Sequence, residues 1–171
     1  EISCSLVGSE MCIRDRSQGS ATENQLEREY LQQSISQNLG VKVELNTVGD
    51  YQMFANERDN KNYDIFVGGW FSDYNDPLDF LNVMKTGVYD SYGLYSNSEY
   101  DSLIDSLTGE NDNAKRLEIY QKLEDLLVAQ DCGVAPLYYS DKHYYYQNWV
   151  KDFYTSSFGA SQELYRATVE K

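Results

Sequence analysis

The sequence predicts an α/β fold, in which helices pack against strands, and three observations support this prediction. A helical repeat of apolar residues runs from Thr22 to Leu39, and an alternating strand pattern follows it from Val41 to Leu45. A second strand pattern, Tyr63–Trp70, comes after a further helical stretch. Of the 171 residues, 41% are hydrophobic and 14% aromatic, and this composition is sufficient for a packed core.

The first predicted helix has clear ends. Thr22, with Gln25 three residues later, forms a capping box, and Gly40 ends the helix. The apolar stripe of this helix consists of Leu26, Tyr30, Leu31, Ile35 and Leu39. In the strand that follows, the apolar and polar residues alternate in the order Val41, Lys42, Val43, Glu44 and Leu45. Alternation of this kind is typical of a strand that buries one face.

The next segment predicts where a functional site should lie. A short helix is expected from about Tyr51 to Arg58. Tyr63–Trp70 (YDIFVGGW) has the pattern of a buried strand with glycines near its end, and Phe71–Pro77 then forms a loop. Because ligands of open α/β sheets bind beyond the carboxyl ends of the strands, this loop is the expected position of a site.

Two helices are expected after this loop. Residues Pro77–Lys85 form a brief helix, since proline suits a first helical position, and Gly87 ends it. Ser98, together with Asp101, caps the next helix, and Gly109 closes it.

A third helix and three strands complete the prediction. Asp112 caps this helix, which ends near Gln130 and has an apolar face made of Leu117, Tyr120, Leu123, Leu126 and Leu127. The predicted strands are Val134–Tyr139 and His143–Tyr146, joined by a turn at residues 140–142, and a last strand within Glu163–Val169. Alternating helices and strands of this kind fit an α/β layer.

The first sixteen residues do not fit the pattern of the rest. Leu6–Arg16 (LVGSEMCIRDR) resembles the translation of a sequencing adapter, so we expect residues 1–16 to be a non-native segment and exclude them from the fold prediction. A signal peptide is the alternative, but the segment lacks a basic start and a continuous apolar core. On this interpretation a native secretion signal is missing.

Excluding Cys4 and Cys12 leaves Cys132 as a single thiol, which we interpret as a small core residue.

The chain is strongly acidic, with 28 acidic against 14 basic residues and a net charge of −14. Such an excess repels phosphate backbones and anionic lipid headgroups, so nucleic acid and membrane surfaces are not expected partners. The longest apolar runs, such as Ile65–Gly69, are far shorter than the roughly 20 residues of a membrane-spanning helix. We therefore expect no direct membrane insertion by this segment.

The sequence contains no clear catalytic, metal or cofactor motif. The acidic loop Asp73–Pro77 lacks the turn glycine of an EF-hand, and the single histidine, His143, has no partner at metal-ligand spacing. We predict no catalytic residue, metal or cofactor.

Two alternative functions stay open. Asp73, Asp76 and Asp79 could belong to an acidic glycoside hydrolase, although glycosidase carboxylates flank their substrate, and the sixteen tyrosines could form a carbohydrate-binding surface.

One stretch resembles a known family. Tyr63–Leu81 (YDIFVGGWFSDYNDPLDFL) is similar to the characteristic D…GW…DY.DP..FL pattern of the oligopeptide- and dipeptide-binding proteins, solute-binding protein family 5, which serve ATP-binding-cassette importers. Val134–Tyr139 resembles the family's P-x-Y strand, and Asn148–Val150 resembles the stretch where the chain returns to the first lobe. The resemblance covers about residues 24–171.

This resemblance implies a fold and a function. The α/β fold would be part of a two-lobed clamshell of the type II periplasmic-binding-protein class, with residues 20–141 in the second lobe and residues 142–171 returning to the first. The protein would not be an enzyme, but would bind oligopeptides in a closing cleft. Its location would be extracytoplasmic, either the periplasm or the outer face of the cell membrane as a lipoprotein. Its partners would be the peptide and the membrane permease of the importer, and the full-length protein would be a monomer.

The resemblance also implies ligand-binding residues. Asp73 matches the aspartate that pairs with the peptide's α-ammonium in the family. The aromatic residues expected to line the same cleft are Trp70, Phe71 and Tyr74. Arg58, twelve residues before Trp70, matches an arginine that some members use near the peptide's C-terminus. A second arginine of some members is replaced by Val67 here, which departs from the family pattern.

Overall fold

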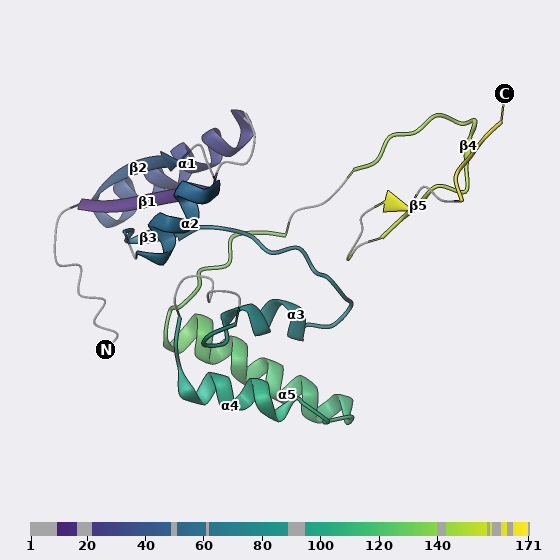
Figure 1. Ribbon diagram of the computed structural model, residues 1–171. Helices are drawn as coiled ribbons and strands as arrows, with labels where there is room; N and C mark the ends of the chain where they lie inside the picture. The colour runs from purple at the N-terminus through teal and green to yellow at the C-terminus, as the bar shows by residue number, and fades with distance from the viewer. Residues whose placement is uncertain are drawn as a thin grey trace. The chain divides into compact units, whose positions relative to one another are not determined.

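The structure is a computed structural model that describes residues 10–16, 22–48, 51–60, 62–88, 95–139, 143–156, 158, 162–163 and 166–170. The chain divides into two compact units, unit 1 (Glu1–Gly69) and unit 2 (Trp70–Lys171). Figure 1 follows the chain through its helices and strands.

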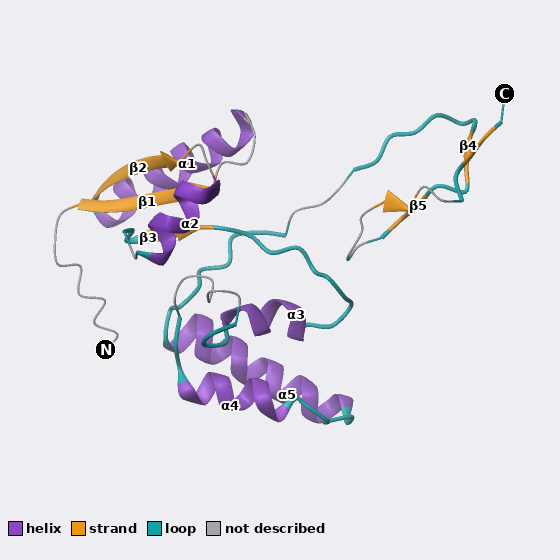
Figure 2. Ribbon diagram, in the orientation of Figure 1, coloured by secondary structure: helices purple, strands orange, loops and turns teal. Residues whose placement is uncertain are grey.

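Unit 1 contains a small parallel sheet whose strands are connected by helices (Figure 2). Within the described residues the sheet has three strands, β1 (Glu10–Arg16), β2 (Lys42–Val48) and β3 (Ile65–Val67), in the order β2-β1-β3. Helix α1 (Thr22–Leu39) connects β1 to β2, and α2 (Tyr51–Asp59) connects β2 to β3. Parallel neighbours require crossover connections of this kind. The predicted α/β class is therefore confirmed.

The central strand β1 lies within the segment that the sequence prediction excludes. Glu10 pairs with Lys42 at one end of the ladder, and Ile13 lies between Leu45 on one side and Ile65 on the other. Strand pairing uses the backbone N–H and C=O groups, and every residue except proline has both, so these ladders do not depend on the side chains of β1. The sequence pattern does not predict this strand, and the non-native origin of residues 1–16 stays a prediction.

Helix α1 has the predicted bounds, but part of its apolar stripe is exposed. The exposed stripe residues are Leu26, Tyr30 and Leu39. Arg28 is buried instead, and Gln32, one turn further on, donates a hydrogen bond of 2.7 Å from Nε2 to the carbonyl oxygen of Val43 in β2. Within unit 1, α1 therefore packs on the sheet with a face that contains polar side chains. The capping box predicted at Thr22 lies outside the described side chains.

The strands of unit 1 match their predictions to different degrees. In β2, Val43 is buried while Lys42 and Glu44 are exposed, which confirms the predicted alternation. β3 is shorter than the predicted strand Tyr63–Trp70, because its pairing with β1 extends over three residues. The residues of β3 are only partly buried. Gly40 has a φ of +68°, the left-handed conformation expected of a residue that ends a helix.

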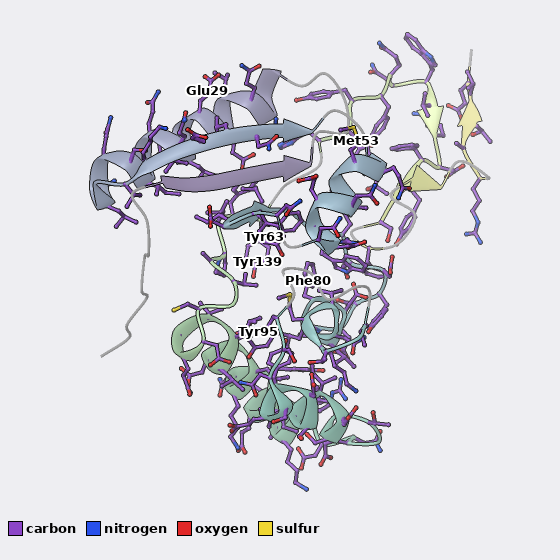
Figure 3. The ribbon with its side chains drawn as sticks, turned by 60° about the vertical axis from the view of Figure 1, so that its left-hand side comes forward. Glu29, Met53, Tyr63, Phe80, Tyr95 and Tyr139 are labelled. Atoms are coloured by element: carbon purple, nitrogen blue, oxygen red, sulfur yellow. The ribbon has the colours of Figure 1, made fainter. Side chains whose placement is uncertain are left out.

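The first part of unit 2 is a group of packed helices: α3 (Leu78–Leu81), the 3₁₀ turn η1 (Asn82–Met84), α4 (Ser98–Ser106), α5 (Asn113–Glu124) and the π-helical turn η3 (Asp125–Gln130). Their buried core consists of Leu81, Val83, Met84, Tyr95, Tyr100, Ile104, Leu107, Tyr120, Leu123, Leu126 and Leu127. Tyr100 is fully buried, and its hydroxyl donates a hydrogen bond of 2.8 Å to the carbonyl oxygen of Leu81. Tyr95, labelled in Figure 3, packs edge-on against Tyr100 with ring centroids 5.2 Å apart.

The helix caps of unit 2 are partly as predicted. The cap of α4 is Asn97, not Ser98, because the Asn97 side chain accepts hydrogen bonds from the backbone N–H groups of Glu99 and Tyr100. Ser98 is already the first helical residue. Asp112 caps α5 as predicted, with its Oδ1 atom accepting from the N–H of Ala114 at 2.9 Å.

In unit 2, Leu117 and Cys132 were predicted to be buried but are exposed. Leu117, the first residue of the predicted apolar face of α5, is exposed, whereas Tyr120 and Leu123 on the same helix are buried. Cys132 follows the end of η3 with a φ of +50°, and its side chain is exposed. The interpretation of Cys132 as a core residue is therefore wrong.

Among its described residues, the C-terminal part of unit 2 contains two short antiparallel pairs, β4 (Val150–Lys151) with β7 (Thr168–Val169) and β5 (Tyr154–Thr155) with β6 (Gln162–Glu163). The last predicted strand is thus found as the separate strands β6 and β7. The strands predicted at Val134–Tyr139 and His143–Tyr146 are wrong, since these residues adopt no strand, and the turn predicted at residues 140–142 lies outside the described residues. A run of β-prone residues forms a strand only where a neighbouring strand supplies a hydrogen-bond ladder.

Candidate functional site

The candidate site is the loop of residues 70–77 at the beginning of unit 2, which leads into α3. It contains four of the five residues predicted to bind ligand. Phe71, Asp73 and Tyr74 are exposed, and Trp70 is partly buried against the helical core. The loop therefore presents two aromatic rings and one carboxylate at its surface.

Asp79, in α3, fixes the beginning of this loop. Its carboxylate is buried, with the residue only 6% exposed. The Oδ2 atom accepts a hydrogen bond of 3.1 Å from the Trp70 indole Nε1–H and another of 2.8 Å from the backbone N–H of Asp73. One carboxylate oxygen thus holds both a side chain and the backbone of the loop.

Asp76 fixes the end of the loop. Its Oδ1 atom accepts hydrogen bonds from the backbone N–H of Leu78 at 2.9 Å and from the hydroxyl of Tyr120 at 2.6 Å. Its Oδ2 atom forms an ion pair with Nη2 of Arg116 at 2.8 Å. Burial by itself raises the pKa of Asp76, but the hydrogen bonds from Tyr120 and Leu78 and the charge of Arg116 outweigh it and hold that pKa below its ordinary value.

Arg116 and Tyr120 connect the loop to helix α5. The Arg116 guanidinium also donates to the carbonyl oxygens of Leu107 and Glu110, at 3.3 and 3.2 Å, and lies over the Tyr120 ring with its Cζ atom 5.4 Å from the centroid. Burial, and then the hydrogen bond to Asp76, raise the pKa of Tyr120 to about 12. Tyr120 therefore stays protonated at neutral pH and donates to Asp76.

This network predicts a pH-dependent contribution to stability. Because the pKa of Asp76 is lowered in the folded state, its stabilisation is present above the unfolded pKa of about 3.9 and is lost as the pH falls through the folded pKa. Asp76→Asn should destabilise the full-length protein by about 1–2 kcal/mol at neutral pH. That difference should shrink on acidification below about pH 4.

Urea unfolding of the wild type and of Asp76→Asn between neutral and acidic pH measures this difference. Tyr120→Phe is the matched control, because it removes one hydrogen bond to Asp76 but keeps the carboxylate and its ion pair with Arg116. We expect Tyr120→Phe to reduce the pH dependence only in part. A stability difference between wild type and Asp76→Asn that is constant across the pH range would contradict the prediction.

Asp73 differs from its two neighbours. Its side chain is exposed, and its carboxylate accepts no hydrogen bond and forms no ion pair with any residue that the structure describes. Only its backbone N–H is engaged, with Asp79. Among the three aspartates of this segment, Asp73 is therefore the one whose carboxylate is open to a cationic ligand.

Arg58, the fifth predicted residue, belongs to unit 1. It lies in the last turn of α2 and is buried. Its Nε and Nη2 atoms contact Oδ1 of Asp59 at 2.9 and 2.8 Å. The structure therefore groups Trp70, Phe71, Asp73 and Tyr74 in one loop and leaves Arg58 outside that loop.

Sequence reasoning missed the residues that hold the loop in place. Asp76 directly precedes Pro77 at the start of a helix, and this pattern could have predicted its bond to the N–H of Leu78. The partnership of Asp76 with Arg116, forty residues later, and the burial of Asp79 have no signal in the local sequence. Within the described residues, no group of three or more His, Cys, Asp or Glu side chains could hold a metal ion. None of the described helices combines the length and the hydrophobicity of a membrane-spanning segment.

Comparison with known sequences assigns the chain to a family. Residues 15–91, which include the candidate loop, match the sequence family described as bacterial extracellular solute-binding proteins, family 5 Middle. The chain is a fragment of a family 5 solute-binding protein. Proteins of this family bind solutes and are not enzymes, so the glycoside hydrolase alternative is set aside.

Individual relatives support this assignment. The chain is 32% identical to the oligopeptide-binding protein OppA of Bacillus subtilis over 124 residues, which are 71% of this chain and 21% of the relative. It is also 32% identical to the periplasmic oligopeptide-binding protein OppA of Salmonella typhimurium over 113 residues, 66% of this chain and 20% of the relative. The family 5 fragment therefore spans about a fifth of the length of the curated relatives that it matches.

Solved structures of relatives match most of the fragment. Listeria monocytogenes OppA bound to peptide matches 95% of this chain and 30% of its own, with 26% identity and a TM-score of 0.75. The substrate-binding domain of an oligopeptide ABC transporter from Bacillus anthracis matches 95% of this chain and 31% of its own, with 26% identity and a TM-score of 0.76. The α/β fragment thus corresponds to part of an OppA-like binding protein.

Proposed function

We propose that the protein containing this chain binds oligopeptides outside the cytoplasm and delivers them to the membrane permease of an ATP-binding-cassette importer. In this proposal the chain is part of a two-lobed clamshell, with residues 20–141 in the second lobe and residues 142–171 returning to the first. Relatives named as oligopeptide-binding proteins, some of them periplasmic, support the proposal. The full-length protein would act as a monomer that closes around its ligand.

The observation that carries the proposal is the exposed carboxylate of Asp73, because the carboxylates of the next two aspartates in the chain, Asp76 and Asp79, are already engaged. A free peptide has a cationic α-ammonium group that loses its hydration when it is bound in a closed cleft. Desolvating such a charge is costly unless an anion is nearby. Asp73 supplies this anion without giving up an interaction inside the described part of the chain.

The aromatic residues of the loop suit the remainder of such a ligand. Phe71 and Tyr74 are exposed beside Asp73, and Trp70 is held by Asp79. Aromatic rings offer a large contact area to peptide backbone and side chains of different shapes. Recognition of the terminus and the backbone, with water filling the side-chain pockets, would give binding with little sequence preference.

Arg58 is the proposed partner of the peptide's C-terminal carboxylate. Its guanidinium is planar and can bind a carboxylate through two parallel hydrogen bonds. Because Arg58 is paired with Asp59, a ligand carboxylate would have to share or replace that ion pair. We therefore expect Asp73 to contribute more to affinity than Arg58.

The proposal is tested with pools of candidate ligands. The full-length protein, freed of bound ligand by unfolding and refolding, is incubated with a mixed peptide pool and, separately, with a mixed oligosaccharide pool. Mass spectrometry then identifies what is retained and whether it is intact. We expect intact peptides and no oligosaccharides. Retention of oligosaccharides without peptides would overturn the proposal and favour the carbohydrate-binding alternative, and cleaved peptides would contradict a binding function.

A further inference from the structure

We propose that Asp79 is a positioning residue of the ligand loop: its buried carboxylate holds Trp70 and Asp73 in the arrangement that receives the ligand. This inference rests on the proposed function, in which Asp73 binds the peptide's α-ammonium group. Asp79 itself would make no contact with the ligand. Its effect on binding would be transmitted by two hydrogen bonds that it accepts, one from the Trp70 indole and one from the backbone N–H of Asp73.

The loop needs such a support because it has little of its own. Residues 68–72 form neither helix nor strand, so no hydrogen-bond ladder fixes their backbone. The Oδ2 atom of Asp79 instead holds this segment through two hydrogen bonds, which it accepts from Trp70 Nε1 at 3.1 Å and from Asp73 N at 2.8 Å. These donors lie three residues apart in the sequence, so a single oxygen fixes the conformation of the chain between them.

Asp79 is itself held rigidly. It lies in α3, whose Leu81 is buried in the helical core, and the η1 residues Val83 and Met84 that follow are buried in the same core. Trp70 also packs against this core. Asp79 thus connects the loop to the packed helices. Ligand-binding groups are positioned most precisely when their neighbours are fixed by packing and hydrogen bonds.

The contacts also define what Asp79 must supply, namely an acceptor oxygen. Both partners are N–H donors, and neither is a charged group. Asp79→Asn retains one carbonyl oxygen that can accept both bonds, whereas Asp79→Ala removes the acceptor and leaves two donors without it. A residue that bound the ligand's ammonium directly would lose as much on Asp79→Asn as on Asp79→Ala, because both remove the negative charge.

Binding of a free-amine peptide recovered from the pool is measured by calorimetry with the full-length protein. We expect Asp79→Ala to weaken binding roughly tenfold or more and Asp79→Asn to weaken it by less than about threefold. In an Asp73→Asn background the further loss caused by Asp79→Ala should be smaller than in the wild type, because the part of the Asp79 effect that acts through Asp73 is already lost. The matched control is Asp131→Ala, whose carboxylate also accepts two hydrogen bonds, in this case from the side chains of Tyr95 and Asn97. This variant should leave affinity within about twofold of wild type.

A second measurement needs no ligand. Hydrogen exchange of the Trp70 indole N–H, followed by nuclear magnetic resonance and assigned with Trp70→Phe, reports directly on the bond to Asp79. We expect exchange to be faster by roughly tenfold or more in Asp79→Ala and little changed in Asp131→Ala. The exposed Trp149 is the internal control.

The two measurements separate this inference from the proposed function. Wild-type affinity in Asp79→Ala, or equal losses in Asp79→Asn and Asp79→Ala, would overturn the positioning role while leaving peptide binding intact. Unchanged exchange of the Trp70 indole in Asp79→Ala would overturn it whether or not peptides bind. Failure of the wild type to retain any peptide would instead overturn the proposed function.

Discussion

Asp73→Asn in the full-length protein is expected to weaken peptide binding by about 2–5 kcal/mol without unfolding the protein. The substitution keeps the shape of the side chain and removes its charge, so the peptide's ammonium group would be buried without a partner. Asp73 is exposed, and its carboxylate accepts no hydrogen bond from the described residues, so the fold should lose little. Calorimetry measures the affinity, and circular dichroism checks the fold.

N-terminal acetylation of the peptide gives an independent test of the same contact. Acetylation removes the ammonium charge, so it should cost wild-type binding a similar amount of free energy. The two losses should be strongly non-additive, because each breaks the same interaction. Asp125→Asn, at an exposed aspartate of η3, controls for the general loss of negative charge and should bind like the wild type. If Asp73→Asn binds as tightly as the wild type, or if the two losses simply add, the ammonium anchor is a different residue.

Leu123→Ala is expected to destabilise the helical part of unit 2 by about 2–5 kcal/mol. Leu123 is fully buried and belongs to the core shared by α3, α4 and α5. Truncation to alanine removes apolar contacts and leaves a cavity that the packed neighbours fill only in part. Urea unfolding of the full-length protein, followed by circular dichroism, measures the loss.

Leu117→Ala is the matched control for this prediction. It makes the same substitution on the same helix, but Leu117 is 57% exposed. We expect a change of less than about 0.5 kcal/mol, since alanine is also a good helix former. Equal destabilisation by the two substitutions would contradict the assignment of Leu123, and not Leu117, to the core.

The helices were predictable because their signals are local. The bounds of α1, the cap of α5 at Asp112 and the end of α1 at Gly40 follow from residues within one or two turns of each other. The strands were less predictable, because a strand exists only with a partner. Val134–Tyr139 is rich in β-prone residues and forms no strand, while β1, in a segment with no strand signal, lies at the centre of the sheet in unit 1.

The candidate site divides in the same way. The sequence by itself determined the family and singled out the candidate loop, because both depend on the contiguous pattern Tyr63–Leu81. Only the tertiary structure decided the roles of the three aspartates in that loop. Asp76 is engaged by Arg116 and Tyr120 of a helix some forty residues later. Asp79 is buried and accepts a hydrogen bond from Trp70, whereas Asp73 remains exposed. The three side chains are chemically identical, so their difference comes from burial and hydrogen-bond partners, which depend on how distant segments pack.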